Sequence, residues 1–317
     1  MLSSELSAGF PDRRFICYCN IQDRRITSYS VYRRARVKMD YQCKAETGVQ
    51  LLARLSTRPN LNTLNDTLFP GGINLGNVIE ISGDSGSGKT TLVTQFLVKC
   101  LLPKTWNEFE IGGLGAGAII VNTDHHFQIL KLVSMMESVL AKCQESAKNE
   151  TKFPRHIDSK RIEKIIKESL SNLIILNCYD SLQLFVTFHS LSNILSCNAN
   201  TSLIIVDSLS AYYWQDAAVG GVRKMDLYLK KTLKALQSCI EEYKVTTVYT
   251  KQTNFQSKVS FTDDCTATPG LGNITYKIQL NRMESKERDL FSAEVSTPVS
   301  KYVHQYKISD EGLLWVK

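Results

Sequence analysis

A glycine-rich segment at residues 83–90, with the sequence GDSGSGKT, constrains the fold of this chain more than any other feature. Its G-x-x-x-x-G-K-T spacing is that of a phosphate-binding loop. An apolar run at 78–82 precedes the segment, and a long apolar-periodic segment that begins at Thr91 follows it. In the order strand, glycine turn and helix, several backbone N–H groups and the positive end of a helix point at one anion. The sequence therefore predicts a strand–loop–helix unit that holds a phosphate group.

The side chains of this loop match the parts needed to hold a nucleotide. Lys89 is placed to reach the β- and γ-phosphates, and the Thr90 hydroxyl is placed to ligate Mg²⁺. We therefore expect ATP and Mg²⁺ as cofactors. The residues expected to contact the nucleotide are Gly83, Asp84, Ser85, Gly86, Ser87, Gly88, Lys89, Thr90 and Thr91. A chance glycine turn ahead of a helix is the alternative, which the agreement of motif and flanking pattern disfavours.

Strand and helix patterns alternate along the middle of the chain and give way to strands near its end. Continuous apolar runs at 118–121, 173–176 and 203–206 indicate strands, and such runs are typical of parallel sheets buried on both faces. Apolar residues spaced by three and four at 229–243 indicate an amphipathic helix. Short strand-like segments follow near 274–283, 289–296, 302–308 and 312–316. This order predicts a mostly parallel α/β sheet flanked by helices, with antiparallel strands added at the C-terminal end.

Other elements are expected from periodicity and from helix breakers. Further helices are expected from the phosphate loop to Pro103, at 127–140, at 157–170 and at 180–196, and a strand is expected at 245–249. Loops are expected at 104–117 and 253–272, and a polar, exposed insertion is expected at 144–156.

The first 40 residues differ from the rest of the chain, because they mix Ser, Arg and Tyr without a sustained period. Residues 1–38 hold eight basic and three acidic side chains, a balance of +5 out of the chain's +7. The basic character therefore lies mostly in this segment and says little about nucleic-acid binding by the rest. We expect a basic, disordered or weakly ordered extension at 1–40, with a targeting peptide as the alternative, and one folded domain at 41–317.

Composition argues against several other classes of protein. No apolar run approaches the roughly 18 residues of a membrane-spanning helix, so no membrane partner is expected. The nine cysteines include no C-x-x-C pair and no paired zinc spacing, and several lie within apolar runs, which favours buried, reduced thiols. The adjacent His125 and His126 are not expected to form a metal site, because neighbouring side chains at a helix start point in different directions.

Three polar residues end predicted strands and belong at the edge of the sheet where the phosphate loop lies. Asp207 ends the apolar run at 203–206 and is expected to hold Mg²⁺ directly or through water, with a strand-end cap as the alternative. Asp124 and Gln252 also follow strands, and the carboxyl ends of parallel strands meet at one edge. Both are candidate catalytic residues, Asp124 to orient or deprotonate a water and Gln252 to touch the γ-phosphate and move the following loop. A solvated loop residue is the alternative for Gln252.

In the order of these segments the chain resembles the RecA family of recombinases. The shared segments are Thr47-Gly48, the phosphate loop, 121–124, 203–208 and 250–252, and the closing stretch from 272 to 312 is similar to that of eukaryotic members. The run SLSAYYW at 208–214 is more specific than the phosphate loop alone. Together with 45–55 and 122–127 it resembles a short recombinase paralogue. The resemblance covers roughly residues 43–317.

The resemblance implies a RecA-like P-loop ATPase core and a function that the residues alone do not indicate. It implies a nuclear subunit of a paralogue complex that supports homologous recombination and repair of DNA double-strand breaks. The partners would be other recombinase paralogue subunits, in a hetero-oligomer, and single-stranded or branched DNA. In this role the chain would assist strand exchange by the recombinase itself.

Three departures from the family pattern bear on this expectation. Asp124 stands where the family has a catalytic glutamate, and a carboxylate withdrawn from the attacking water by one methylene loses on the order of 100-fold in rate. Trp214 stands where the family has an arginine of a DNA-binding loop. Stacking on a base, worth ~1–3 kcal/mol, and contact with an apolar partner are the two alternatives for it. The Phe-x-x-Ala segment by which recombinases link into filaments is missing before residue 46, which predicts a terminal subunit.

The candidate DNA contacts are Tyr213, Trp214, Arg223 and Lys224. For the two basic residues, solvated charges at a helix start are the alternative. Two functions stay open at this point. In the first, bound ATP mainly stabilises a protein assembly, and in the second the chain is a self-sufficient DNA-dependent ATPase. A small-molecule kinase is a third, which the absence of a lid segment with clustered arginines disfavours.

Overall fold

The computed structural model describes residues 47–48, 51–52, 57–106, 109–150, 159–220, 224–253, 274–283 and 290–316. The chain divides into two units, Met1–Ala45 and Glu46–Lys317, and all of the described residues belong to the second. The predicted extension at 1–40, nearly all of the predicted loop at 253–272 and Arg223 therefore lie outside the described residues. Among the residues that are described, no helix is both long enough and apolar enough to cross a membrane.

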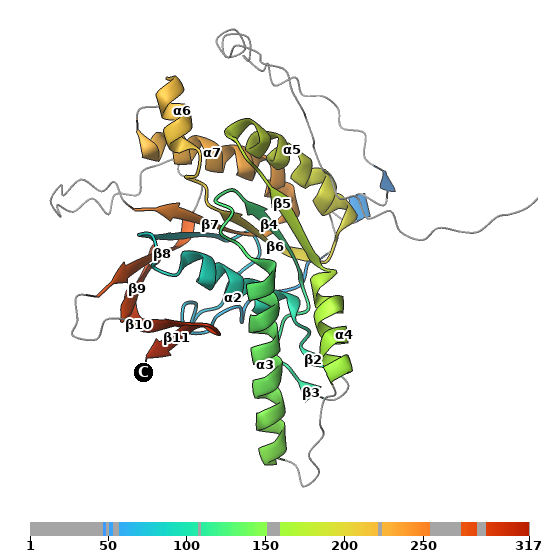
Figure 1. Cartoon of the computed structure of the whole chain (residues 1–317). Coiled ribbons are helices and arrows are strands. Elements are labelled where there is room, and N and C mark those ends of the chain that lie inside the picture. The colour runs from blue at the N-terminus through green and yellow to red at the C-terminus, as the bar shows by residue number, and fades with distance from the viewer. Residues whose placement is uncertain are drawn as a thin grey trace, which may run out of the picture. The chain divides into compact units, whose positions relative to one another are not determined.

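The described part of the chain is built on a nine-stranded sheet with the order β11-β10-β9-β8-β1-β7-β6-β4-β5 (Figure 1). Strands β1, β4, β5, β6, β7 and β8 pair in parallel, and β9, β10 and β11 continue the sheet in antiparallel fashion beyond β8. The bounds are Val78–Gly83 (β1), Gly117–Asn122 (β4), Leu173–Asn177 (β5), Thr201–Asp207 (β6), Thr246–Gln252 (β7), Ile274–Arg282 (β8), Phe291–Ser296 (β9), Lys301–Ser309 (β10) and Gly312–Val316 (β11). The prediction of a mostly parallel sheet with antiparallel C-terminal strands is confirmed.

Helices cover both faces of the parallel part of the sheet (Figure 1). The helices on one face are α2 (Lys89–Leu101), α3 (Ile129–Glu150) and α4 (Ser159–Leu170), and those on the other are α5 (Ser181–Cys197), α6 (Tyr213–Val219) and α7 (Met225–Ile240). The apolar runs of β4 and β6 supply side chains to both layers. Ile120 and Ile205 face the first layer, whereas Ile119 and Ile204 face the second. Because both faces are covered, these strands are continuously apolar instead of alternating.

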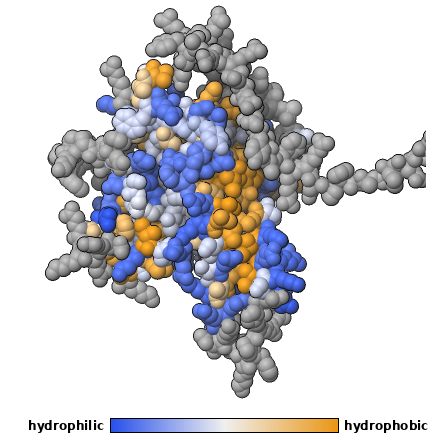
Figure 2. All heavy atoms as spheres, in the orientation of Figure 1, coloured by the Kyte–Doolittle hydropathy of each residue, from blue (hydrophilic) through white to orange (hydrophobic). Residues whose placement is uncertain are grey.

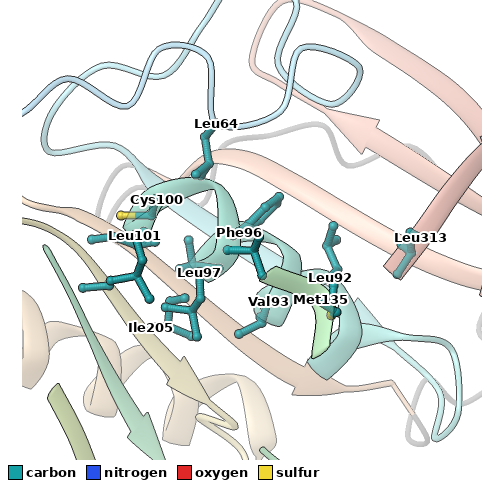
Figure 3. Close-up of a cluster of buried hydrophobic side chains, with 14 of the residues drawn as sticks. Leu64, Leu92, Val93, Phe96, Leu97, Cys100, Leu101, Met135, Ile205 and Leu313 are labelled. Atoms are coloured by element: carbon teal, nitrogen blue, oxygen red, sulfur yellow. The ribbon is translucent and has the colours of Figure 1, made fainter. Parts of the chain in front are cut away.

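Helix α2 lies at the centre of the first layer. Figure 3 shows its apolar side chains, Phe96 among them, packed against residues of several other elements. The surrounding residues are Leu64 ahead of the sheet, Met135 of α3, Ile205 of β6 and Leu313 of β11. Close packing on several sides fixes α2 against the sheet, and it thereby fixes the helix N-terminus that follows the phosphate loop.

A buried arginine joins the ends of two helices. Arg58 is 5% exposed, and its guanidinium donates hydrogen bonds to backbone carbonyl groups only. The acceptors are the carbonyl oxygens of Leu195 (3.2 Å), Asn198 (3.1 Å), Ala199 (3.4 Å), Thr201 (2.5 Å) and Tyr243 (3.0 Å). Helix α5 ends next to the first of these carbonyls, and the 3₁₀ turn Glu241–Tyr243 follows α7. The guanidinium therefore lies at the negative ends of two helix dipoles.

The structure corrects three local expectations. The expected loop at 104–117 contains a hairpin of β2 (Thr105–Trp106) and β3 (Phe109–Glu110), whose two-residue strands are too short to show a period. Residues 144–150 form the end of α3 and are not a separate insertion, and the rest of the expected insertion, 151–156, lies outside the described residues. The sequence of 144–150, QESAKNE, is rich in good helix formers but lacks the apolar residues on which periodicity depends. Helix α6 was not expected, because its seven residues make only about two turns.

Helix α3 also starts later than the predicted residue 127. It begins at Ile129, so Phe127 precedes it, and Leu130, an apolar residue of the predicted helix, is 79% exposed. The buried residues of the helix include Leu132, Met135, Met136 and Leu140. The segment has apolar residues on two neighbouring faces, so its spacing alone does not determine which face is buried.

The expectation of buried cysteines is met only in part. Cys100 and Cys178 are buried, and burial raises the pKa of the Cys100 thiol to about 12. Cys143 and Cys239 are half-buried, however, and Cys197 is exposed.

Candidate nucleotide site

The phosphate loop connects β1 to α2 through glycines that its conformation and its surroundings require. Gly86 and Gly88 have φ angles of 77° and 91°, in the left-handed region that residues with a Cβ rarely adopt. At Gly83 the obstacle is space, because a Cβ there would lie 2.5 Å from Ser87 Oγ and 2.6 Å from Leu280 O. Two different physical demands therefore account for the glycine spacing of the motif.

The C-terminal strands support this loop from the side. Tyr306 of β10 is fully buried, and its hydroxyl donates a hydrogen bond to Ser87 O (2.6 Å). Burial raises the pKa of that hydroxyl, so it keeps its proton and stays a donor. A Cβ on Gly88 would lie 3.1 Å from Ile308 Cδ1, so β10 also packs directly on the loop. The sequence offers no local signal for Tyr306, since the contact joins positions 219 residues apart.

Lys89 lies over the loop that it is expected to serve. Its Nζ donates hydrogen bonds to Gly83 O (2.8 Å) and Asp84 O (2.8 Å). Burial lowers the pKa of the ammonium group, and the nearby charges of Asp207, Asp124 and Asp84 oppose that shift. A phosphate in the loop would compete with the two carbonyls for the ammonium group, because a hydrogen bond between two charged groups is the stronger one.

The two residues predicted to hold Mg²⁺ are in contact. Asp207 ends β6 and is 2% exposed, and its Oδ2 accepts a hydrogen bond from Thr90 Oγ1 (2.9 Å). Its Oδ1 accepts another from Thr250 Oγ1 (2.6 Å) on β7. Thr250 was expected only as part of the family-like segment at 250–252, and not as a member of the site. A carboxylate beside a hydroxyl is a hard oxygen donor set of the kind that Mg²⁺ prefers, so these residues fit the expected metal.

Asp124 lies beside Asp207 at the carboxyl edge of the sheet. The backbone N–H groups of Thr123 and Asp124 both donate to Asp207 O, at 2.9 and 3.2 Å. Burial raises the pKa of the Asp124 carboxyl, and the negative charge of Asp207 raises it further, while His126 and Lys89 act in the opposite direction. The structure thus brings together the acidic residues and the lysine that the sequence placed at the ends of separate elements.

Gln252, the last residue of β7, lies next to the phosphate loop. In the parallel pairing of β1 with β7 it is the register partner of Gly83. Its backbone N–H donates to Ser210 Oγ (3.2 Å), and its side chain is exposed. The following residue, Thr253, donates from Oγ1 to Asp84 Oδ1 (2.6 Å). The end of β7 is therefore tied to the loop, and a shift of the loop would reach the segment after β7.

A buried acid ties the same two strands further from the loop. Glu80 of β1 is 6% exposed, accepts a hydrogen bond from the Tyr249 hydroxyl (2.5 Å) and pairs with Lys251 Nζ (2.9 Å). Burial, and then the charge of Glu80, raises the pKa of Tyr249, which therefore remains a donor. The signal available in the sequence was an acid in the middle of the apolar run at 78–82.

The residues predicted to contact DNA are divided between the core and the surface. Tyr213 is 6% exposed, and its ring packs on Tyr228 of α7 with centroids 5.6 Å apart, so it lies in the core and not at the surface. Trp214 is 55% exposed, and Lys224, the N-cap of α7, is also exposed. Contact of these two residues with DNA stays a prediction, whereas Tyr213 supports its neighbour from inside. Arg223 lies outside the described residues.

The two histidines after Asp124 were expected at the start of a helix, but they do not begin one. His125 has a φ of 55°, and its ring stacks on that of Tyr179 with centroids 4.6 Å apart. Helix α3 begins only at Ile129. The two histidines therefore extend the rim of the site at the ends of β4 and β5.

Known protein families and structures match the parts of the chain that carry the site. A family model described as KaiC ATPase matches residues 47–105, and one described as Rad51 matches residues 157–288. The DNA repair protein XRCC2 of Mus musculus is 30% identical over 268 residues, which cover 82% of this chain and 88% of that protein. The XRCC2 homolog of Arabidopsis thaliana is 27% identical over 187 residues, covering 54% and 50%. The crystal structure of the RadB recombinase has a TM-score of 0.54 and 21% identity, covers 80% of this chain and 96% of that one, and supports the fold.

Proposed function

Because the chain belongs to the RecA family of recombinases, in the group of DNA repair protein XRCC2, we propose that it is an ATP-binding paralogue subunit that acts in homologous recombination and in repair of DNA double-strand breaks. It works in the nucleus, in a hetero-oligomer with other recombinase paralogues, and it assists strand exchange on single-stranded or branched DNA. Residues 41–317 form its ATP-binding core, and residues 1–40 are an extension. The observation that carries the proposal is the contact of Thr90 with Asp207 beside a complete phosphate loop.

The residues of the site divide the task of holding ATP and Mg²⁺. The backbone N–H groups of residues 83–91 bind phosphate oxygens, and Lys89 turns from the loop carbonyls to the phosphates. Thr90 and Asp207 hold the metal. Thr250 engages the other carboxylate oxygen of Asp207 and so keeps Oδ2 directed at Thr90. When bound, the metal ion neutralises phosphate charge.

ATP in this site is mainly held, and it is turned over slowly. Asp124 stands where the family has a catalytic glutamate, and its side chain is one methylene shorter than glutamate. A displacement of that size costs on the order of 100-fold in rate. Gln252 instead contacts the γ-phosphate and senses its presence. The hydrogen bond from Thr253 to Asp84 transmits movements of the phosphate loop to the end of β7. Bound ATP then stabilises the assembly with the other paralogues.

The test uses the full chain to capture partners from a nuclear extract, with and without ATP and Mg²⁺, and identifies them by mass. We expect recombinase-family proteins to be captured more strongly with ATP and Mg²⁺. Lys89→Ala should remove that increase. Lys104→Ala is the matched control, because Lys104 is an exposed lysine outside the loop, and it should behave as the parent.

Steady-state ATP hydrolysis by the purified chain tests whether ATP is mainly held or turned over. We expect slow turnover that DNA stimulates little. Brisk, DNA-stimulated hydrolysis that disappears in Asp124→Ala would refute the holding role.

A self-sufficient DNA-dependent ATPase is the second candidate function. The complete set of Lys89, Thr90, Asp207 and Gln252 at one edge of the sheet favours it. This alternative fails if Lys89→Ala binds partners and DNA as well as the parent does, because nucleotide turnover would then have no part in either. A small-molecule kinase would show ADP formation that depends on a metabolite acceptor.

A further inference from the structure

Helix α7 carries a row of lysines on the side that faces away from the sheet. Its buried residues are Tyr228, Leu229, Thr232, Leu233, Leu236 and Ile240. Lys224, Lys231 and Lys234 are exposed and Lys230 is half-buried. At 3.6 residues per turn these four lie within about a third of the helix circumference. We call them the α7 lysine face.

The α7 lysine face has few acidic residues near it. Helix α5, which packs beside α7, contains no acidic residue, and the acids of the adjoining elements are Asp226 of α7, Asp216 of α6, and Glu241 and Glu242 of the 3₁₀ turn after α7. Asp226 lies one turn from Lys230. Lys231 and Lys234 have no acid three or four positions away, and they are neighbours of each other at that spacing. Like charges one turn apart repel each other on a helix, so this helix is destabilised by its own side chains unless an anion lies between them.

Two exposed lysines of α4 are arranged differently. On α4, Lys164 pairs with Glu168 (3.9 Å) and Lys167 pairs with Glu163 (2.6 Å), each one turn away along the helix. None of the four lysines of the α7 lysine face forms an ion pair with an acidic side chain that the structure describes. The positive charges of Lys164 and Lys167 are therefore neutralised by acids of their own helix, whereas those of Lys231 and Lys234 are not.

An exposed aromatic ring lies at the N-terminal end of the α7 lysine face. Trp214 of α6 packs edge-on against Tyr213 (centroids 4.9 Å apart), and Tyr213 packs on Tyr228 of α7 (5.6 Å). Tyr228 is one turn from both Lys224 and Lys231. The exposed indole is thus fixed beside the first turns of α7, while 55% of Trp214 remains accessible. A cationic track next to an exposed ring is the combination that binds a polyanion with stackable bases.

The length of the track also suits such a ligand. Lys224 and Lys234 are ten residues apart, which is about 15 Å along a helix. One strand of duplex DNA places about four phosphates along that distance. An acidic peptide would satisfy the lysines but would make no use of the indole ring.

We infer that the α7 lysine face is a binding track for the phosphate backbone of nucleic acid, with Trp214 stacking on a base at its end. This inference rests on the proposed function, because it names the surface through which the paralogue holds its DNA. Lys231 and Lys234 contact phosphates, and their contact adds to whatever the segments on either side of α6 contribute.

The test compares two double variants of the full chain that change net charge equally, Lys231→Gln/Lys234→Gln on α7 and Lys164→Gln/Lys167→Gln on α4. Binding of fluorescent oligo-dT is measured by anisotropy over a range of salt concentrations. Each lost phosphate contact lowers the slope of log K against log salt by about 0.7, so the α7 variant should lose about 1.4 in slope and bind about 25-fold more weakly at 0.1 M salt. The α4 variant should keep the slope of the parent. Trp214→Leu should weaken binding without changing the slope.

Three outcomes would overturn the inference. Equal loss of slope in both double variants would mean that only net charge matters. An unchanged slope in the α7 variant, or no salt-dependent DNA binding by the parent, would mean that these lysines contact no phosphate. Competition by poly-glutamate as strong as by DNA, with Trp214→Leu unaffected, would assign the surface to an acidic protein. Partner capture by the same variants is measured in parallel, so failure of the proposed function is seen separately from failure of this track.

Discussion

Replacing Arg58 tests how strongly one buried side chain holds this fold together. Its guanidinium donates to five carbonyl oxygens, and three of these, on Leu195, Thr201 and Tyr243, are in buried hydrogen bonds. A buried carbonyl left without a donor costs ~1–3 kcal/mol. For three such carbonyls, Arg58→Ala would lower the free energy of unfolding by ~3–9 kcal/mol if nothing compensated for the lost hydrogen bonds. Entry of water, and release of the arginine from its own desolvation, offset part of that loss. We therefore expect the free energy of unfolding to fall by ~3–5 kcal/mol, a large part of the ~5–15 kcal/mol of a typical domain.

Urea unfolding of the full chain measures this loss from the midpoint shift at constant m-value. Arg58→Lys keeps the charge but loses the fork of donors, so its loss should be intermediate. Arg58→Met keeps most of the apolar stem but has no donor, and it should be nearly as destabilising as alanine. Arg161→Ala, at an exposed position of α4, is the control and should change stability by less than about 0.5 kcal/mol. A methionine variant as stable as the parent would refute the reasoning, because packing of the stem would then be the cause.

Two further predictions concern the nucleotide site. Tyr306→Phe removes the hydrogen bond to Ser87 O in the phosphate loop, and the control Tyr302→Phe removes a hydrogen bond to Leu68 O outside it. Each variant should lose about 1 kcal/mol of stability. Only Tyr306→Phe should reduce the rise in melting temperature caused by ATP and Mg²⁺. Because the folded protein raises the pKa of Asp124, the nucleotide-free chain should lose stability as pH rises from the ordinary aspartate range through that raised pKa. Asp124→Asn should flatten this part of the pH–stability curve in denaturation experiments, and an unchanged curve would contradict the assignment.

Much of the fold and part of the site follow from local sequence. The phosphate loop is contiguous, and its glycines, Lys89 and Thr90 act through neighbouring backbone, so the motif alone indicates the geometry. The meeting of Thr90 with Asp207 also follows from the sequence, because the ends of parallel strands share one edge of the sheet. These are features in which distance along the chain and position in space are linked by a simple rule.

The remaining parts depend on register and on long-range packing, which no local pattern records. Thr250 belongs to the site because β7 pairs with β1 and β6 in one register, and a shift by one residue would turn its hydroxyl away from Asp207. Tyr213 was a candidate DNA contact because it belongs to the family-like run at 208–214. Adjacent residues of the unforeseen helix α6 point in different directions, so Tyr213 is buried while Trp214 is exposed.

The exposed apolar surface over β5 could not be predicted from local sequence either. Figure 2 shows a continuous hydrophobic band on the visible face, over β5 and along the helices beside it. The band arises because β5 is an edge strand whose apolar run is only partly covered, with Ile175 38% exposed. The apolar run at 173–176 reads like those of the buried strands, and only the strand order reveals that it lies at an edge.

The hydrogen bond from Tyr306 to the phosphate loop has a consequence for how this protein comes into being. The loop and its supporting tyrosine are 219 positions apart in the chain. At a synthesis rate of about 5–20 residues per second, the loop is made roughly 10–45 s before the strand that supports it. During that interval the nascent chain carries the complete nucleotide motif without a supported site. A premature stop ahead of β10 would therefore leave a polypeptide that sequence inspection identifies as nucleotide-binding, but whose loop has lost the strands that hold it.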